Sequence, residues 1–315
     1  MGKKQNRIEA ERLVGAPFKR GPFFVKKVNN FFHKHIMSRG DFMKKSICML
    51  GGDERNDVLA ELLKDREFIV KKYSDNDSDI ESFLDGASLV ICGIPFSRDS
   101  LTVNAPEFSG RVSIEKLFLS MKDNKKLLAG SFSSKVKEIA NRYEIELYDF
   151  LDDEDFAIYN AIPTAEGAIE VAMKETRRTI HSSNCLVLGF GRIGKILADL
   201  LKGLHANVTV VARKDEDLAW IKAMGYVGAR YSELEEILPH TDILFNTVPA
   251  LVIKDELRKM KKDSLIIDLA SKPGGVDFEL ANSLGIKAEL LLGLPGKVAP
   301  SSVAEYMLKR VLKVN

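Results

Sequence analysis

Three glycines are the residues of this sequence best placed to do chemistry, because Gly189, Gly191 and Gly194 follow the apolar run 185–188 with the spacing G-x-G-x-x-G. In that spacing the first glycine permits a tight turn, and the second lets a pyrophosphate approach the backbone. The third lets the next helix pack closely on its strand, and the N–H groups that begin this helix bind the phosphates. The spacing predicts a dinucleotide site, and the alternative is an ordinary turn between a strand and a helix.

The residues after the next strand predict which dinucleotide binds. A site for NAD usually places Asp or Glu there, about twenty residues beyond the glycines, to hold the ribose hydroxyls. Here the run 207–211 leads instead to Arg213 and Lys214. A guanidinium binds a 2′-phosphate through paired, charge-assisted hydrogen bonds, whereas a carboxylate repels it. We therefore expect NADP as the cofactor, with NAD as the alternative if Arg213 is only solvated and balanced by the acidic residues 215–217.

Residues that follow other predicted strands are further candidates, because ligands of open α/β sheets bind outside the carboxyl ends of the strands. Those expected to contact the cofactor are Phe190, Arg192, Ile193, Asn246, Thr247, Val248, Pro249, Ala270 and Gly293. Those expected to bind a small dicarboxylate substrate are Lys272 and Arg55, which are cations at strand ends, together with Arg98 and, from a connecting helix, Asn160 and Thr164. The alternative for Arg98 is that it is a solvated surface charge.

Alternating strands and helices must position these residues. The predicted strands are residues 46–50, 68–72, 88–92, 126–130, 145–148, 185–189, 207–211, 243–247, 264–269 and 287–292. Because helical segments separate these short apolar runs, we predict an α/β fold with two Rossmann-like, doubly wound domains and parallel sheets. A long helix over about residues 164–178 is expected to join the two domains across a cleft.

The expected domains are a basic extension (1–42), an N-terminal substrate domain (43–160) and a cofactor-binding domain (161–298). The last segment, 299–315, has apolar residues at helical spacing and is expected to pack back on the N-terminal domain. The net charge is +7 for residues 1–42 and −5 for the remainder. A mildly acidic core argues against nucleic acid as a partner. The apolar runs of the extension are too short for a signal peptide or a membrane span.

The cysteines and histidines predict no metal site. Cys48, Cys92 and Cys185 lack C-x-x-C spacing and lie in apolar runs, as buried free thiols of a reducing cytoplasm do. The five histidines form no pattern of metal ligands.

Several segments together resemble one family, the A subunit of dipicolinate synthase from endospore-forming bacteria. They cover residues 43–315 in the order that the family has them, whereas residues 1–42 lie outside the resemblance. The segments are GGDER at 51–55, DFAIYNAIPTAEG at 155–167, LGFGRIG at 188–194, DLASKPGGVD at 268–277 and GLPGKVAP at 293–300.

The resemblance implies oxidation of 2,3-dihydrodipicolinate to dipicolinate, a pyridine dicarboxylate, with NAD(P) as acceptor, in the mother-cell cytoplasm of a sporulating bacterium. It also implies the flavoprotein-like B subunit of dipicolinate synthase as partner, and we expect a homo-oligomer as well. Where the family usually has Arg in the phrase S-[RK]-P-G-G, this chain has Lys272. The positive charge is kept, but the bidentate geometry of arginine is lost.

Formation of an aromatic ring favours the loss of hydride and proton, so a positioned carboxylate or water suffices as base. Glu166 is the first candidate and Asp53 the second. Their structural alternatives are a first-turn carboxylate for Glu166, a turn cap for Asp53 and a helix cap for Thr164. One alternative function is a dehydrogenase of the D-2-hydroxyacid or alanine type, whose proton donor is most often histidine. No histidine follows His240. The other alternative is a non-catalytic NADP-binding scaffold for a partner protein.

Overall fold

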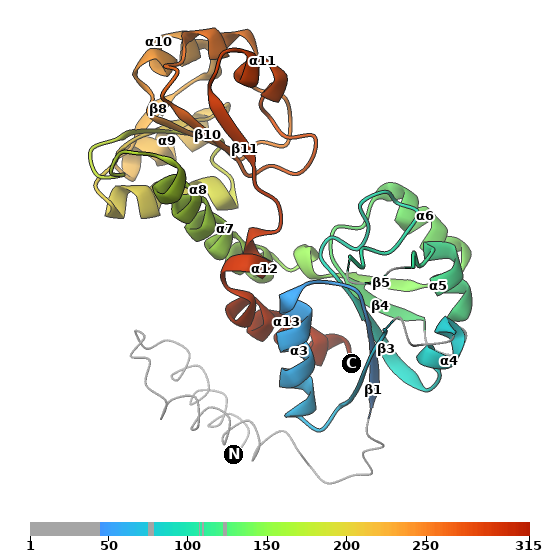
Figure 1. Ribbon diagram of the computed structural model, residues 1–315. Coiled ribbons are helices and arrows are strands. Elements are labelled where there is room, and N and C mark those ends of the chain that lie inside the picture. Colours follow the sequence, from blue (N-terminus) through green and yellow to red (C-terminus); the bar gives the residue numbers. More distant parts are fainter. Residues whose placement is uncertain (1–44, 75–78, 107, 109, 122–124) are drawn as a thin grey trace, which may run out of the picture. The chain divides into compact units, whose positions relative to one another are not determined.

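Two parallel sheets form the framework of the chain. The computed structural model describes residues 45–74, 79–106, 108, 110–121 and 125–315. Residues 44–315 form one compact unit, in which helices and strands alternate (Figure 1). Every strand pair within the two sheets is parallel, so the predicted α/β fold with two doubly wound sheets is confirmed. The expected extension, residues 1–42, lies outside the described residues, and the expected domain boundary at residue 160 stays a prediction.

The first sheet has five strands in the order β2-β1-β3-β4-β5. The strands are β1 Ser46–Leu50, β2 Ile69–Lys72, β3 Ala87–Cys92, β4 Lys126–Ala129 and β5 Glu146–Asp149. The helices between them are α3 Glu54–Lys64, α4 Ile80–Leu84, α5 Ile114–Ser120 and α6 Ser134–Arg142. The strand order reverses between β1 and β3, and ligands of such sheets bind at the carboxyl ends beside this reversal. Asp53, Arg55 and Arg98 follow these two strands.

The second sheet has six strands in the order β11-β10-β9-β6-β7-β8. The strands are β6 Asn184–Leu188, β7 Asn207–Val211, β8 Val227–Ala229, β9 Ile243–Asn246, β10 Leu265–Asp268 and β11 Lys287–Leu290. The helices are α8 Arg192–Gly203, α9 Asp215–Ala223, α10 Leu234–Ile237, α11 Phe278–Ser283 and α12 Leu294–Val298. Its order reverses between β6 and β9, as in the dinucleotide-binding form of this fold. The glycine turn after β6 therefore lies at the expected place for a nucleotide.

The helix between the two sheets begins earlier than expected. Helix α7 spans Glu154–Glu175, whereas the sequence predicts residues 164–178, so that prediction is wrong at both ends. The expected start at residue 164 leaves Pro163 outside the helix, and proline does remove a hydrogen bond from a helix interior. The apolar face nevertheless continues on both sides of Pro163, with Phe156 and Ala161 buried. Packing of this face outweighs the local cost of the proline, so Thr164 lies inside the helix and is not its cap.

The C-terminal helix α13, Pro300–Val314, lies beside α3 (Figure 1). Its apolar face completes one of the cores of the first sheet, because Val303, Met307 and Val311 cluster with residues of β1 and α3 such as Met49 and Leu59. Burial of one such side chain contributes about 1.5–3 kcal/mol to the stability of the fold.

Several short elements escape prediction from the sequence. Strand β8 has three residues, two of them exposed, so it shows no apolar run. Helices α4, α5 and α9 to α12 have four to nine residues, which is too few turns to show an apolar period. Within the described part of the chain, no helix combines the length and the apolar character that crossing a bilayer requires.

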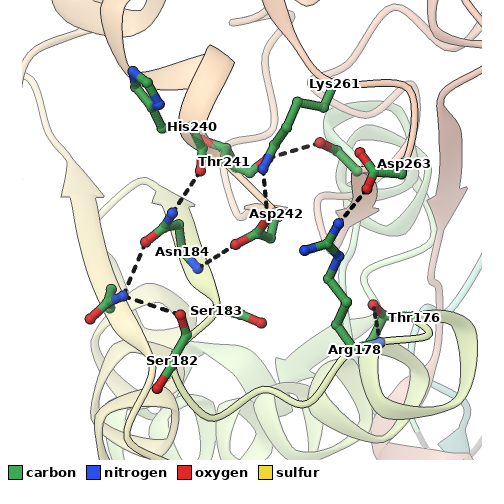
Figure 2. A network of polar contacts seen from close by, with 12 residues as sticks. Thr176, Arg178, Ser182, Ser183, Asn184, His240, Thr241, Asp242, Lys261 and Asp263 are labelled. Atoms are coloured by element: carbon green, nitrogen blue, oxygen red, sulfur yellow. Dashed lines mark hydrogen bonds and ion pairs between the residues drawn. The ribbon is translucent and has the colours of Figure 1, made fainter.

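A polar network closes the amino edge of the second sheet (Figure 2). Asp242 accepts hydrogen bonds from the Asn184 N–H at 2.8 Å and from Lys261 Nζ at 2.6 Å. The Asn184 side chain donates to the His240 carbonyl at 2.9 Å. His181, His205 and His240 each precede a strand and so lie at this edge, opposite the glycine turn.

Candidate active site

The three glycines of the turn after β6 have three different structural roles. Gly189 has a φ of 95°, in the region that favours glycine, and an added Cβ would lie 2.6 Å from Thr247 Oγ1. At Gly194 an added Cβ would lie 2.2 Å from the Gly189 carbonyl oxygen, so only glycine lets α8 pack this closely. At Gly191 an added Cβ would meet no atom within 4 Å. The space at Gly191 is where a pyrophosphate can approach the backbone.

The start of helix α8 fits a dinucleotide. Gly191 is the N-cap and has no side chain to bond the first N–H groups of this 12-residue helix. Those N–H groups carry the positive end of the helix dipole. The open space at Gly191 and the uncapped helix terminus together suit a pyrophosphate.

The end of β7 carries positive charge. Arg213 and Lys214 are exposed, and no carboxylate stands at the strand end. Asp215, one of the residues expected to balance Arg213, forms an ion pair with Arg230 instead. Arg230 also donates to the Arg213 carbonyl at 3.4 Å. Within the described ranges the Arg213 guanidinium has no hydrogen-bonded partner, so it is available to an anionic ligand.

Some of the expected cofactor contacts are structural. Asn246 is fully buried, and both ends of its side-chain amide bond to protein atoms: Nδ2 donates to Val248 O and Asp268 Oδ1, and Oδ1 accepts from the Val248 N–H. The expectation that Asn246 contributes to the cofactor site stays a prediction, and its side-chain amide is occupied by these protein contacts. The Thr247 hydroxyl donates to the Leu188 carbonyl at 2.8 Å.

The other expected cofactor contacts differ in their exposure. The side chains of Phe190 and Ala270 are buried, so these two residues offer a cofactor only their backbone. Ile193 and Val248 are half-buried, and Arg192, Pro249 and Gly293 are exposed.

Asp53 and Arg55 bind each other. Asp53 caps α3 by accepting the Arg55 N–H, and its carboxylate accepts Arg55 Nε and Nη2, each at 2.8 Å. Arg55 also donates to the Ile94 carbonyl at 2.7 Å and to Asn160 Oδ1 at 3.4 Å, and its side chain is only 3% exposed. An added Cβ on Gly296 would lie 2.5 Å from Asp53 Oδ2, so α12 presses against the pair. These contacts give both side chains structural partners, and the expectations that Arg55 anchors a substrate and that Asp53 acts as a base stay predictions.

The remaining candidates for substrate binding differ in how many of their polar atoms already have a hydrogen-bond partner. Arg98 is exposed, and its Nε donates to Asn104 Oδ1 at 3.0 Å, which leaves both Nη groups without a partner among the described residues. Lys272 and Glu166 are exposed and have no hydrogen-bonded partner in the same described ranges. The Thr164 hydroxyl is directed into its own helix, where it donates to the Asn160 carbonyl at 2.9 Å.

Sequence reasoning missed Asp268, although a carboxylate that ends an apolar strand is a visible signal. Asp268 is fully buried at the end of β10. Its carboxylate accepts the Asn246 side chain and the N–H groups of Ala270 and Gly275. No three His, Cys, Asp or Glu side chains in the described segments lie together in a way that could hold a metal ion.

Two family profiles divide the chain between its sheets. Residues 46–151 match the N-terminal domain of the dipicolinate synthase A subunit, and residues 161–277 match the NAD-binding domain of D-isomer-specific 2-hydroxyacid dehydrogenases. The dipicolinate synthase A subunit of Bacillus subtilis is 33% identical over 282 residues, which are 85% of this chain and 95% of that protein. The chain belongs to the family of dipicolinate synthase A subunits. The resemblance found in its sequence segments is thereby confirmed.

Solved structures of dipicolinate synthase A subunits share the architecture. The Bacillus halodurans protein has a TM-score of 0.78 at 30% identity and covers 86% of this chain and 98% of its own. The B. subtilis protein has a TM-score of 0.74 at 30% identity and covers 88% of this chain and 97% of its own. A D-lactate dehydrogenase from Sporolactobacillus shows the same fold at 18% identity, with a TM-score of 0.60 and coverage of 85% and 96%. The dehydrogenase-type NAD-binding domain makes this member of the family an oxidoreductase with a nicotinamide cofactor.

Proposed function

We propose that this chain oxidises 2,3-dihydrodipicolinate to dipicolinate, pyridine-2,6-dicarboxylate, with NADP as the hydride acceptor. The name of the B. subtilis relative supplies the product. The observation that carries the proposal is the glycine turn, which combines open space at Gly191 with an uncapped helix terminus in a chain of this family.

The proposed substrate site uses the cations and donors that the protein leaves free. Lys272, at the carboxyl edge of the second sheet, binds one carboxylate of the substrate. Arg98, at the carboxyl edge of the first sheet, binds the other, and Asn104 holds its guanidinium from behind. Asn160 contributes its amide N–H groups, because its oxygen already accepts from Arg55. These contacts hold the substrate ring in one orientation toward the nicotinamide. Holding two reactants in a reactive orientation lowers the entropic part of the activation barrier.

Oxidation of the substrate releases one hydride and one proton. When bound, NADP supplies the hydride acceptor at nicotinamide C4. Glu166 accepts the proton as general base, because it is an exposed carboxylate on α7, the helix that also carries Asn160. The gain of aromaticity in the ring lowers the demand on this base.

Cofactor choice is tested at Arg213. Arg213→Asp replaces the free cation at the end of β7 with a carboxylate that repels the 2′-phosphate. We expect the ratio of NADP to NAD affinity to fall by at least about tenfold and the preference to invert. Equilibrium titration with both nucleotides measures the ratio, with Arg258→Asp as the control for the same change of charge at an exposed arginine elsewhere in the domain. An unchanged ratio contradicts NADP as the preferred cofactor.

Two observations bear on the alternatives. A hydroxyacid dehydrogenase needs a proton donor beside its substrate, but the three histidines in the described part of the chain lie at the amino edge of the second sheet. A non-catalytic scaffold needs no free cation at the carboxyl edges, yet Arg98 and Lys272 are both exposed there. We therefore place the chemistry in this chain, with the flavoprotein-like B subunit of dipicolinate synthase as its partner in the cytoplasm.

The deciding experiment mixes the purified chain with freshly generated dihydrodipicolinate and NADP, with and without the B subunit. We expect dipicolinate and NADPH to appear in equal amounts. Product with the chain alone assigns the chemistry to it, and product only with both proteins assigns a shared role. No product in either mixture, with NADP binding intact, contradicts the proposed substrate.

A further inference from the structure

The turn between β10 and α11 is built around one buried carboxylate. Asp268 Oδ1 accepts the Ala270 N–H at 2.9 Å, and Oδ2 accepts the Gly275 N–H at 2.7 Å. These two N–H groups bracket the exposed residues 271–273, so the carboxylate closes the turn from the inside. Lys272 is the middle residue of that exposed segment.

The two glycines that follow Lys272 and Pro273 make this closure possible. Gly274 has a φ of 93°, and an added Cβ would lie 2.8 Å from Asp268 Oδ2. At Gly275 an added Cβ would lie 2.4 Å from Asn246 Nδ2 and 2.6 Å from the Val248 carbonyl oxygen. The sequence S-K-P-G-G is thereby explained: the glycines let the backbone approach the buried carboxylate and its amide partner.

The same carboxylate also fixes a second loop. Asn246 Nδ2 donates to Asp268 Oδ1 at 2.8 Å and to the Val248 carbonyl at 3.0 Å. Asn246 Oδ1 accepts the Val248 N–H at 3.1 Å. The loops after β9 and β10 are therefore held by one buried network, and loss of one partner there leaves a buried polar group unsatisfied.

We infer that Asp268 is a positioning residue that holds Lys272 in place for an anionic ligand at the carboxyl edge of the second sheet. The inference rests on the proposed function in one respect, namely that the ligand is a dicarboxylate. Asp268 itself touches no ligand, because it is completely buried and its oxygens are occupied.

A change of Asp268 can alter dicarboxylate affinity through its charge or through the position of Lys272, and the two effects have opposite signs. Asp268→Asn removes a negative charge near a dianion, and by Coulomb's law alone this tightens binding. An amide has only one oxygen, so at least one of the three N–H donors would then face an NH2 group. Loss of the closed turn displaces Lys272 and weakens binding. A weaker complex therefore identifies a positioning role.

The test measures the affinity of pyridine-2,6-dicarboxylate by calorimetry in the presence of NADP. We expect Lys272→Met to weaken it about tenfold and Asp268→Asn about fivefold, as for loss of a charge-assisted hydrogen bond. In the double variant the two losses should not add, because without Lys272 the turn has nothing left to position. Asp277→Asn is the matched control, since it removes the same charge nearby and asparagine still caps α11. Tighter binding by Asp268→Asn, or additive losses, overturns the inference.

A second variant and a second readout cover the remaining outcomes. Gly274→Ala leaves the carboxylate intact but pushes against it, and we expect the same non-additivity with Lys272→Met. Amide hydrogen exchange needs no dicarboxylate: residues 270–275 should exchange faster in Asp268→Asn and not in Asp277→Asn. If the unaltered chain binds NADP but no dicarboxylate, the proposed function fails, and amide exchange alone then decides whether Asp268 holds the turn. Unchanged exchange overturns that role.

Discussion

At the scale of single residues, contacts that are distant in sequence decide what each candidate side chain can do. Arg55 stands at a strand end with the charge that a carboxylate ligand needs, and the sequence predicts a binding role. Ile94 and Asn160 come from other parts of the chain and, with Asp53, occupy its guanidinium. The spacing of these residues in the sequence does not predict that they contact one another. Lys272, in contrast, is an exposed cation that follows a strand, as the sequence predicts.

Burial should make the three thiols unreactive. Burial raises the pKa of Cys48 to about 11, although the charge of Lys71 opposes the shift. It also raises the pKa of Cys185 to about 12 and the pKa of Cys92. Only the thiolate is nucleophilic. We expect no rapid reaction of the folded protein with Ellman's reagent at pH 8 and three reactive thiols after denaturation in guanidinium. A thiol that reacts at the same rate before and after unfolding would contradict this.

Asp242 should make stability depend on pH (Figure 2). Burial alone would raise its pKa, but the hydrogen bonds from Lys261 and the Asn184 N–H, with the charges of Lys261 and Arg178, lower the pKa overall. The pKa of Asp242 is therefore lower in the folded chain than in the unfolded chain, where it is about 3.9. The stabilisation that the ionised carboxylate provides is complete above pH ~4 and is lost as the pH falls through the folded pKa.

Asp242→Asn tests this at two pH values by urea denaturation. We expect a loss of about 1–2 kcal/mol at pH 7 and a smaller difference near pH 3. Asp263→Asn is the matched control, because its pair with Arg178 is more than half exposed on both sides and such pairs contribute about 0–1 kcal/mol. Equal losses for the two variants at pH 7 would argue against the role of Asp242.

At the scale of elements, the sequence predicts strands better than helices. Apart from β8, every strand of the two sheets is predicted, and the predicted and observed ends differ by at most two residues. Helix α7 was mispredicted because Pro163 carries a strong local signal, while its packing partners are distant. Gly167 shows one of these contacts, since an added Cβ would lie 2.7 Å from Val298 Cγ2 of α12. A close contact between two helices produces no periodic pattern of apolar residues, so it cannot be recognised in a single sequence.

Two alanine substitutions separate folding from nucleotide binding at the glycine turn. Gly194→Ala puts a Cβ against the Gly189 carbonyl, and we expect it to lower the free energy of unfolding by about 1–3 kcal/mol. Gly191→Ala meets open space, so the melting temperature should hold while NADP affinity falls about tenfold or more, because the Cβ fills the space beside the pyrophosphate.

Thermal unfolding and nucleotide titration of both variants provide the comparison, with Gly203→Ala as control. Gly203 lies at the end of the same helix with no atom near its Cβ position, so alanine there should be neutral or stabilising. NADP binding by Gly191→Ala with unchanged affinity would place the pyrophosphate elsewhere.

At the scale of the whole molecule, the two ends of the described chain share one core. Strand β1 opens the first sheet, and α13, the last helix, covers it together with α3. The apolar spacing of residues 299–315 predicts a helix with one apolar face. The sequence analysis expects this face to pack on the N-terminal domain, but which residues it contacts there depends on the path of the chain through α12, which no local pattern shows.

Met307→Ala measures the contribution of this shared core. Met307 is fully buried, and truncation of such a side chain costs about 2–5 kcal/mol through lost burial and the cavity left behind. Leu312→Ala on the same helix is the matched control, since Leu312 is 49% exposed and should cost less than about 1 kcal/mol. Chemical denaturation of both variants compares them, and equal effects would show that α13 is not part of the core.

The position of α13 also has a consequence for synthesis. A ribosome delivers β1 long before Val303, Met307 and Val311, so one apolar face of the first sheet stays uncovered until α13 has been translated. The strands from β6 to β11 have all been translated by then. A chain cut before α13 therefore leaves that face of the first sheet exposed, and exposed apolar surface of this kind favours aggregation.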